Sequence, residues 1–336
     1  MASLDIFNND AFSLSALTET IVDIPRVPTI IGDMGLFGES GINSTTMMIE
    51  RKGASLNLVP SAPRGGVGQG VTRDKRKMIS VIAPHLPQAD SVLADEVQGI
   101  RAFGSETEVE AVQTKVAERL GKMKANLDLT LEFHRVGAIK GQVLDADGSV
   151  LHDMYSIFGM TQTVVPWNIA TVSAAGDVKQ SSIDLKRAIQ AALGGRSYKN
   201  ALVLCSQGFF DDMVKHQSVA KAYSNFQNTN FFNTDQSEAD FAFAGVTYRI
   251  YLGGTSAGDF IPDGEAYGLP IGVPGQFITR YAPADYMETV NTNGLPYYAK
   301  QELMRMNKGV DFEAQSNPIN LNTLPETVFR LKASAS

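Results

Sequence analysis

One segment carries the residue pattern of a serine hydrolase. Residues 254–258, Gly-Thr-Ser-Ala-Gly, match the G-x-S-x-G turn that exposes a nucleophilic serine for acyl transfer. That turn is followed by a helix and, later in the chain, by the catalytic histidine. Pro262 disfavours a helix, and all four histidines precede Ser256: His85, His134, His152 and His216. The segment therefore indicates a glycine-rich loop, and an α/β-hydrolase-like enzyme is the alternative that this loop alone suggests.

A second glycine-rich segment resembles a phosphate-binding loop in composition. Residues 65–70 read Gly-Gly-Val-Gly-Gln-Gly. A dinucleotide fingerprint beginning at Gly66 and Gly68 needs glycine at position 71, which is Val71, and a P-loop needs Gly-Lys-Ser/Thr, which does not occur. The following residues are charged and lead into a strand instead of a helix. We therefore expect no nucleotide at this loop.

The remaining candidates for metal binding or acid–base chemistry are not spaced for it. The histidines show no H-E-x-x-H or similar ligand pattern. Cys205 is the one cysteine, which excludes a disulfide framework within the chain and a cysteine-based zinc site. Asp211 and Asp212 adjoin a predicted helix start, where they are expected to cap the helix. We expect no catalytic residue, no metal and no cofactor, and a protein that is not an enzyme.

Amino-acid composition further narrows the class of protein. The chain has 336 residues, of which 43% are hydrophobic, enough for a sizeable core in one large or two modest domains. The net charge of −7 argues against a protein that coats nucleic acid with a basic face. No apolar run reaches the ~18 residues that a membrane-spanning helix needs, so we expect no membrane partner.

Charge is unevenly distributed along the chain. Residues 1–50 have seven acidic side chains and one arginine, a net charge of −6, whereas residues 51–77 have seven basic side chains and one acidic, a net charge of +6. One interpretation is two solvated segments with a chance bias. The sharper one is that both segments meet oppositely charged surfaces on this chain or on a copy of it. The candidate inter-subunit contacts are Asp23, Arg26, Arg51, Lys52, Arg64, Arg73, Lys75, Arg76 and Lys77.

Two stretches near the N-terminus look unable to fold alone. In residues 1–44, Pro25 and Pro28 favour an extended path, and no helical or alternating period organises the apolar residues. We expect an arm that lies on a folded surface and that the subunit can lose without unfolding. Residues 45–85 predict a two-stranded excursion with a flexible glycine-rich tip.

A long amphipathic helix is the clearest element. Apolar residues repeat at steps of three and four from Val109 to Leu131, after a capping box formed by Ser105 and Glu108. Basic residues in its second half are read as complementing the helix dipole. Gly104 separates this helix from a shorter one. Five glycines are candidate hinges, the alternative being turns in a static loop: Gly65, Gly66, Gly68, Gly70 and Gly104.

The rest of the chain mixes helices and strands without a βαβ repeat, so we expect an α+β fold. Asp147-Gly148 predicts a hairpin turn. A helix is predicted over 181–193, ended by Gly194 and Gly195. A strand follows at 201–206, and two short helices lie between 209 and 226. Residues 297–306 are predicted to be helical.

The order of these elements resembles the major capsid proteins of tailed bacteriophages with the Hong Kong 97-type fold, and most closely the lambda-type phage capsid protein E family. The similar segments are 18–37 (TETIVDIPRVPTIIGDMGLF), 62–87, 94–155 and 279–302. The resemblance implies an N-arm at 1–44, an extended loop at 45–88, a peripheral domain at 89–160 and 305–336 with a long spine helix, and an axial domain at 161–304.

The resemblance also implies a function. The chain would assemble with itself into hexamers and pentamers of an icosahedral shell around double-stranded DNA, which is confined and not tightly bound. A separate scaffold protein, a portal and a decoration protein are the implied partners. The protein would belong to the virion capsid and assemble in the cytoplasm of the host bacterium. An encapsulin-like nanocompartment shell, which shares the fold, is the alternative.

Overall fold

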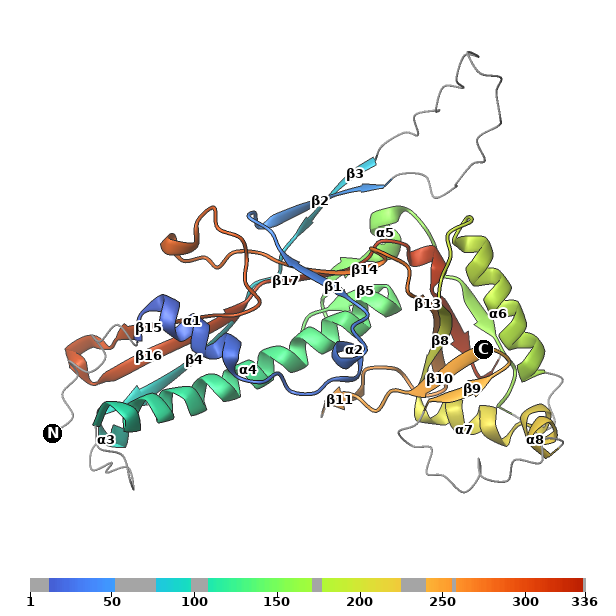
Figure 1. Cartoon of the computed structure of the whole chain (residues 1–336), viewed down its shortest axis with the longest axis horizontal. Coiled ribbons are helices and arrows are strands. Elements are labelled where there is room, and N and C mark those ends of the chain that lie inside the picture. The colour runs from blue at the N-terminus through green and yellow to red at the C-terminus, as the bar shows by residue number, and fades with distance from the viewer. Residues whose placement is uncertain are drawn as a thin grey trace, which may run out of the picture.

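The computed structural model describes residues 12–51, 77–97, 108–170, 177–224, 240–255 and 258–334. The molecule is elongated, and helix α4 (Glu108–Lys140) runs along it between two unequal ends (Figure 1). A three-stranded sheet forms one end, a six-stranded sheet forms the other, and a further three-stranded sheet lies between them. This is the α+β organisation that the sequence predicts.

Helix α4 is the longest element. Its 33 residues span about 50 Å at ~1.5 Å per residue. The predicted stripe is confirmed where side chains are described, because five of its members are at most 4% exposed: Val116, Leu120, Met123, Leu127 and Leu131. The helix runs through Gly137 and ends before Gly141, whose φ of +98° suits glycine. Ser105 and Gly104 lie outside the described residues.

The first end is an antiparallel sheet in the order β15-β16-β4, packed on α4. Its elements are β4 (Leu86–Leu93), the short helix α3 (Ala94–Val97), β15 (Tyr298–Leu303) and β16 (Gly309–Ser316). The predicted helix over 297–306 is therefore wrong. Lys300, Gln301 and Glu302 favour helices locally, but full pairing of β15 with β16 overrides that weak preference.

The expectation of an extended N-terminal arm is wrong as well. Helix α1 (Leu14–Asp23) begins at Ser13, whose side chain accepts a hydrogen bond from the amide of Ala16, and it ends two residues before Pro25. The prolines limit the helix without preventing it. Leu17 and Ile21 are buried against β15 and α4, in one apolar cluster with Leu120. The arm is therefore part of the subunit's core.

The second end is a mixed sheet in the order β7-β18-β13-β8-β10-β9. Its strands are β7 (Val164–Pro166), β8 (Asn200–Cys205), β9 (Phe241–Phe243), β10 (Val246–Ile250), β13 (Glu265–Ile271) and β18 (Phe329–Lys332). Strand β8 is the predicted strand and is buried from Ala201 to Cys205 because it lies between two neighbours.

Three helices pack on this sheet: α6 (Val178–Ala192), α7 (Gln207–Lys215) and α8 (Gln217–Ser224). All three match predicted helices, and α6 ends at Gly194 and Gly195, both with positive φ. The expectation that Asp211 caps α7 is wrong. Ser206 is the cap, and the Asp211 carboxylate lies 3.5 Å from the ammonium of Lys215, one turn along the helix.

The middle sheet joins distant parts of the chain. Strand β1 (Gly38–Gly41) runs parallel to β14 (Phe277–Tyr281), which pairs antiparallel with β17 (Pro318–Asn322). Nearby lie α2 (Ile30–Asp33), α5 (Met154–Phe158) and the hairpin of β5 (Gln142–Leu144) and β6 (Val150–Asp153). Gly148 has a φ of +84°, which confirms the predicted turn.

The predicted two-stranded excursion leaves the body as an antiparallel pair, β2 (Thr46–Arg51) and β3 (Lys77–Ile82) (Figure 1). Ile49 and Val81 on one face are buried in the central core. Met48 and Ile82 on the other face are 65% and 67% exposed. A small pair, β11 (Gly254–Thr255) with β12 (Gly258–Asp259), flanks Ser256, which lies outside the described residues.

Replacing Leu120 with alanine should destabilise the unassembled subunit by about 2–5 kcal/mol, because Leu120 is fully buried between the sheet and α1. Leu129→Ala is the matched control on the same helix, since Leu129 is 44% exposed. Urea unfolding measures the free energy of unfolding of both variants. The control should change it by only about 0.5 kcal/mol. Equal losses would show that the packing of α4 is wrong.

Candidate functional site

Cys205 and His134, whose side chains are of types that can take part in catalysis, are both buried. Among the described residues, no group of three or more His, Cys, Asp or Glu could hold a metal ion. Burial raises the pKa of the Cys205 thiol and lowers the pKa of His134 to about 4, so both are neutral at pH 7. None of the described helices combines the length and apolarity that crossing a bilayer requires.

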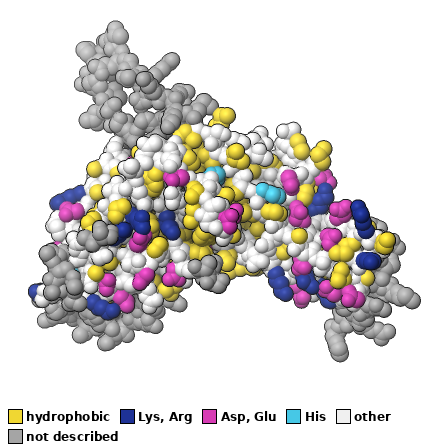
Figure 2. All heavy atoms as spheres, turned by 180° about the vertical axis from the view of Figure 1, so that it is seen from behind, with side chains coloured by type: hydrophobic (Ala, Val, Ile, Leu, Met, Phe, Trp, Pro, Cys, Tyr) yellow, Lys and Arg dark blue, Asp and Glu magenta, His cyan; other side chains and the backbone are white. Residues whose placement is uncertain are grey.

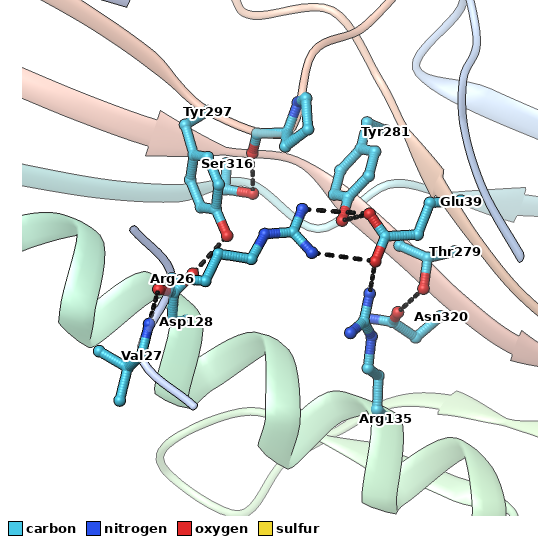
Figure 3. Close-up of polar contacts among 11 residues, drawn as sticks. Arg26, Val27, Glu39, Asp128, Arg135, Thr279, Tyr281, Tyr297, Ser316 and Asn320 are labelled. Carbon is cyan, nitrogen blue, oxygen red and sulfur yellow. Dashed lines mark hydrogen bonds and ion pairs between the residues drawn. The ribbon is translucent and has the colours of Figure 1, made fainter. Parts of the chain in front are cut away.

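Buried polar contacts instead concentrate where the N-terminal arm crosses α4 (Figure 3). Lys124, Asp128, Glu132 and Arg135 follow one another by about one turn and so lie on one face of the helix. All four are between 1% and 4% exposed. Burying a charge is costly unless it is paired, so their partners determine what this row of residues does. We call these four residues the α4 ladder.

Lys124 binds the end of the arm helix. Its ammonium donates hydrogen bonds to the carbonyl oxygens of Ile21 at 2.7 Å and Val22 at 3.0 Å, and also to that of Ile24. These belong to the last turn of α1 and the residue after it, where carbonyls lack helical partners and the helix dipole is negative. Burial lowers the pKa of Lys124. The ammonium therefore serves as the C-terminal cap of α1.

Asp128 and Glu132 bind the arm beyond that helix. The amide of Val27 donates to Asp128 Oδ2 at 3.0 Å, and the amide of Ile31 donates to Glu132 Oε1 at 2.7 Å. The ladder thus recognises the arm mainly through its backbone. Three residues of the arm lie between the two amides, and their carboxylate partners are one helical turn apart on α4.

Arg135 and Arg26 meet on Glu39, at the start of β1. Arg26 donates to both carboxylate oxygens of Glu39 at 3.1 Å, and Arg135 lies 2.5 Å from one of them (Figure 3). Burial alone would raise the pKa of Glu39, but the hydrogen bond from Arg26 and the charge of Arg135 outweigh it and lower that pKa to about 2. The carboxylate is therefore held ionised between two guanidinium groups.

Three tyrosines, each in or next to a strand of a different sheet, complete the contacts. The hydroxyl of Tyr297, just before β15, donates to Asp128. That of Tyr251, just after β10, donates to Glu132 at 3.1 Å, and that of Tyr281, in β14, donates to Glu39 at 3.0 Å. Burial, reinforced by these carboxylates, raises the pKa of all three hydroxyls, which keeps them donors. The ladder thereby connects the arm to all three sheets.

The sequence alone did not reveal this site. Arg26 was selected as an inter-subunit contact, and the structure places it in an ion pair within its own chain. Asp23 is the exposed last residue of α1. The available signal was the spacing of Lys124, Asp128 and Glu132 beside the apolar stripe, but their partners lie about a hundred residues away in the chain.

The other selected residues are not brought to this site. Arg51 and Lys77 face each other across the end of the β2–β3 pair, and their side chains are outside the described residues. The rest of the selected set lies wholly outside the described residues, namely Lys52, Arg64, Arg73, Lys75 and Arg76 with the candidate hinges Gly65, Gly66, Gly68, Gly70 and Gly104. Their roles stay predictions.

The architecture to be compared is a long helix crossed by an arm, with a projecting hairpin and two unequal sheet-based ends. The fold matches a capsid protein assigned to a prophage of E. coli CFT073, with a TM-score of 0.58 at 12% identity over 96% of this chain and 99% of that one. It also matches the mature capsid of bacteriophage PhiM1, with a TM-score of 0.54 at 13% identity over 92% and 88% of the two chains.

The sequence identifies the family. The sequence model of the phage major capsid protein E family matches residues 13–333, and the chain belongs to that family. The major capsid protein of Pseudomonas phage KPP10 is 26% identical over 96% of this chain and 97% of its own length. That of Salmonella phage Felix O1 is 24% identical over the same shares.

Family membership decides between the alternatives raised by the sequence. The chain is a structural subunit of a tailed-phage head, not an enzyme and not a nanocompartment shell, and it belongs to the virion capsid. Subunits of this kind form a shell by association with copies of themselves. The Hong Kong 97-type fold that the resemblance implied is confirmed.

Replacing Glu39 with glutamine should destabilise the subunit at pH 7 by roughly 1–3 kcal/mol, because Arg135 is left buried without a carboxylate. Glu39 has a folded pKa of about 2, below the ordinary 4.5, so its contribution is present above pH 4.5 and is lost as pH falls toward 2. Urea unfolding between pH 7 and 3 should show wild type and variant converging. A difference independent of pH would contradict the ion pair. The control is Glu19→Gln, at an exposed position of α1.

Proposed function

We propose that the subunit enters the head already folded, with its arm bound to its own α4 ladder, and that the β2–β3 hairpin reaches a neighbouring copy. The pairs that hold the arm lie within one chain, whereas the hairpin departs from the body. The N-arm would comprise residues 1–44 and the extended loop residues 45–88.

The domain division follows the same proposal. Residues 89–160 and 305–336 would form the peripheral domain and 161–304 the axial domain. Strand pairing suggests two adjustments. Residues 298–303 pair with β16 and β4, so they would move with the peripheral domain. Residues 329–332 pair with β13 and β7, so they would move with the axial domain.

The partners beyond the chain itself are also proposals. Hexamers and pentamers, a scaffold protein, a portal and a decoration protein are suggested by the family. The net charge of −7 favours confinement of double-stranded DNA over tight binding to it. The candidate hinge glycines would serve expansion of the shell. Assembly would take place in the cytoplasm of the host.

The observation that supports a contact between the hairpin and a neighbouring copy is the exposed apolar face of the hairpin. Side chains alternate along a strand, and the face opposite the core presents Met48 and Ile82, both about two-thirds exposed. Figure 2 shows further hydrophobic side chains across the middle of the rear face, between the more charged ends. Apolar surface of this kind is normally covered by another protein.

Changing Met48 and Ile82 together to aspartate should reduce the yield of shells at least about tenfold, since burying one such side chain contributes about 1.5–3 kcal/mol at an interface. The subunit should keep its helix content, because both side chains are exposed. Electron microscopy of particles made with the phage's other head proteins, together with circular dichroism, measures both. Leu252→Asp, at a site 56% exposed, is the control. Normal shell yield in the double variant would refute the contact.

A further inference from the structure

A small cavity lies between the arm and α4, beside the α4 ladder. Its volume is about 80 Å³. Asp128, Glu132 and Arg135 line it from the helix, and residues between Arg26 and Asp33 line it from the arm. The cavity therefore occupies part of the surface along which the arm rests on the helix.

Two buried polar atoms of the residues that line this cavity have no hydrogen-bonding partner among the residues that the structure describes. They are Oε2 of Glu132 and Nε of Arg135. Both bonds that Glu132 accepts, from the amide of Ile31 and the hydroxyl of Tyr251, go to Oε1, and the bond from Arg135 to Glu39 uses Nη2. Glu132 and Arg135 are each 3% exposed. Because an unpaired buried donor or acceptor is costly, these two atoms point to a molecule that binds both of them.

The lining of the cavity suits a small neutral molecule that both donates and accepts hydrogen bonds. The Nε–H group of Arg135 needs an acceptor, and the carboxylate of Glu132 needs a donor. The carboxylates of Asp33, Asp128 and Glu132 disfavour an anion, and the guanidinium groups of Arg26 and Arg135 disfavour a cation. A water molecule takes up about 30 Å³ in the liquid, so the cavity has room for about two or three of them.

The residue at position 32 keeps this space open. Gly32 lines the cavity, and a Cβ atom there would come within 2.3 Å of the Thr29 hydroxyl oxygen and 3.6 Å of Nη1 of Arg135. Thr29 also lines the cavity and immediately precedes α2, but its side chain makes no capping hydrogen bond to that helix. The hydroxyl of Thr29 is therefore available to a molecule in the cavity.

We propose that the cavity binds a cluster of about two or three ordered water molecules, which joins the arm to α4. One water accepts a hydrogen bond from Nε of Arg135 and donates one to Oε2 of Glu132, and another binds the hydroxyl of Thr29. This inference rests on the proposed function, in which the arm binds its own ladder, and it adds that part of the contact is made through water. Water that bridges two polar groups can be nearly as favourable as a direct hydrogen bond.

Substitutions of Thr29 test the water cluster by urea unfolding of the unassembled subunit. Thr29→Val keeps the shape of the side chain and removes no helix cap, but it takes one partner from the water. It should raise the equilibrium constant for unfolding about tenfold, equivalent to about 1.4 kcal/mol. Thr29→Ser, the matched control, keeps the hydroxyl and should change that constant only about twofold. In a dry cavity Thr29→Val would be neutral or stabilising, and either result would overturn the proposal.

A density map of the wild-type subunit in the head, at a resolution that shows ordered water, locates the molecule directly. It should show a peak roughly 2.7–3.2 Å from both Oε2 of Glu132 and Nε of Arg135. The absence of that peak would overturn the proposal. A peak with several oxygen contacts at roughly 2.0–2.6 Å, as a metal ion makes, would overturn it as well.

Hydrogen exchange separates a failure of the water cluster from a failure of the proposed function. The amide of Val27 is bound directly by Asp128, without the cavity. If that amide is protected in a subunit whose map shows no water, the arm still binds its own ladder and only the water cluster is refuted. Exchange of the Val27 amide at the rate of an unstructured peptide would refute the placement of the arm and the water cluster together.

Discussion

The structure depends on the burial of four ionisable side chains along one face of α4. Lys124, Asp128, Glu132 and Arg135 would be strongly unfavourable without partners, and the partners are backbone groups of the arm, Glu39 and the tyrosine hydroxyls. Without the arm, Lys124 and Arg135 would lose the partners described above, and Asp128 and Glu132 would keep only their tyrosine hydroxyls. The arm and the long helix must therefore fold together, although a proline-rich segment of this kind looks like a separate tail.

This constraint explains how an elongated subunit keeps one shape. Each main sheet contributes one tyrosine to a carboxylate at the ladder or at Glu39, so the two ends and the middle are fixed to the same helix. The arm loses its conformational entropy when the subunit folds, so shell formation does not carry that cost. Assembly can then rely on surface that the folded subunit leaves open, such as the apolar face of the hairpin.

The sequence predicted the elements that are determined by residues close together in the chain. The stripe of α4, the Asp147-Gly148 turn and the β2–β3 pair follow from periodicity and turn chemistry within a few residues. Helix α1 was not predicted because Pro25 and Pro28, which follow it, favour an extended chain. Strand β15 was not predicted because its residues favour a helix locally, and pairing with β16 overrides that preference. Of the ladder, the sequence interpretation included only Lys124 and Arg135, as basic residues that complement the helix dipole, because the partners of all four become neighbours only in the fold. Arg26 was predicted to contact a neighbouring subunit, and in the structure it pairs with Glu39 of the same chain.

Hydrogen exchange in the unassembled subunit tests the central claim most directly. The amide of Val27 lies between α1 and α2, and that of Ile31 lies in the first turn of α2, where helical amides have no partner within the helix. Their protection therefore depends on Asp128 and Glu132. We expect both to exchange as slowly as the amides in the middle of α4, and Asp128→Asn and Glu132→Gln each to accelerate exchange, most at the amide that the changed residue binds. Exchange of both amides at the rate of an unstructured peptide, while α4 stays protected, would show that the arm is not held by its own subunit.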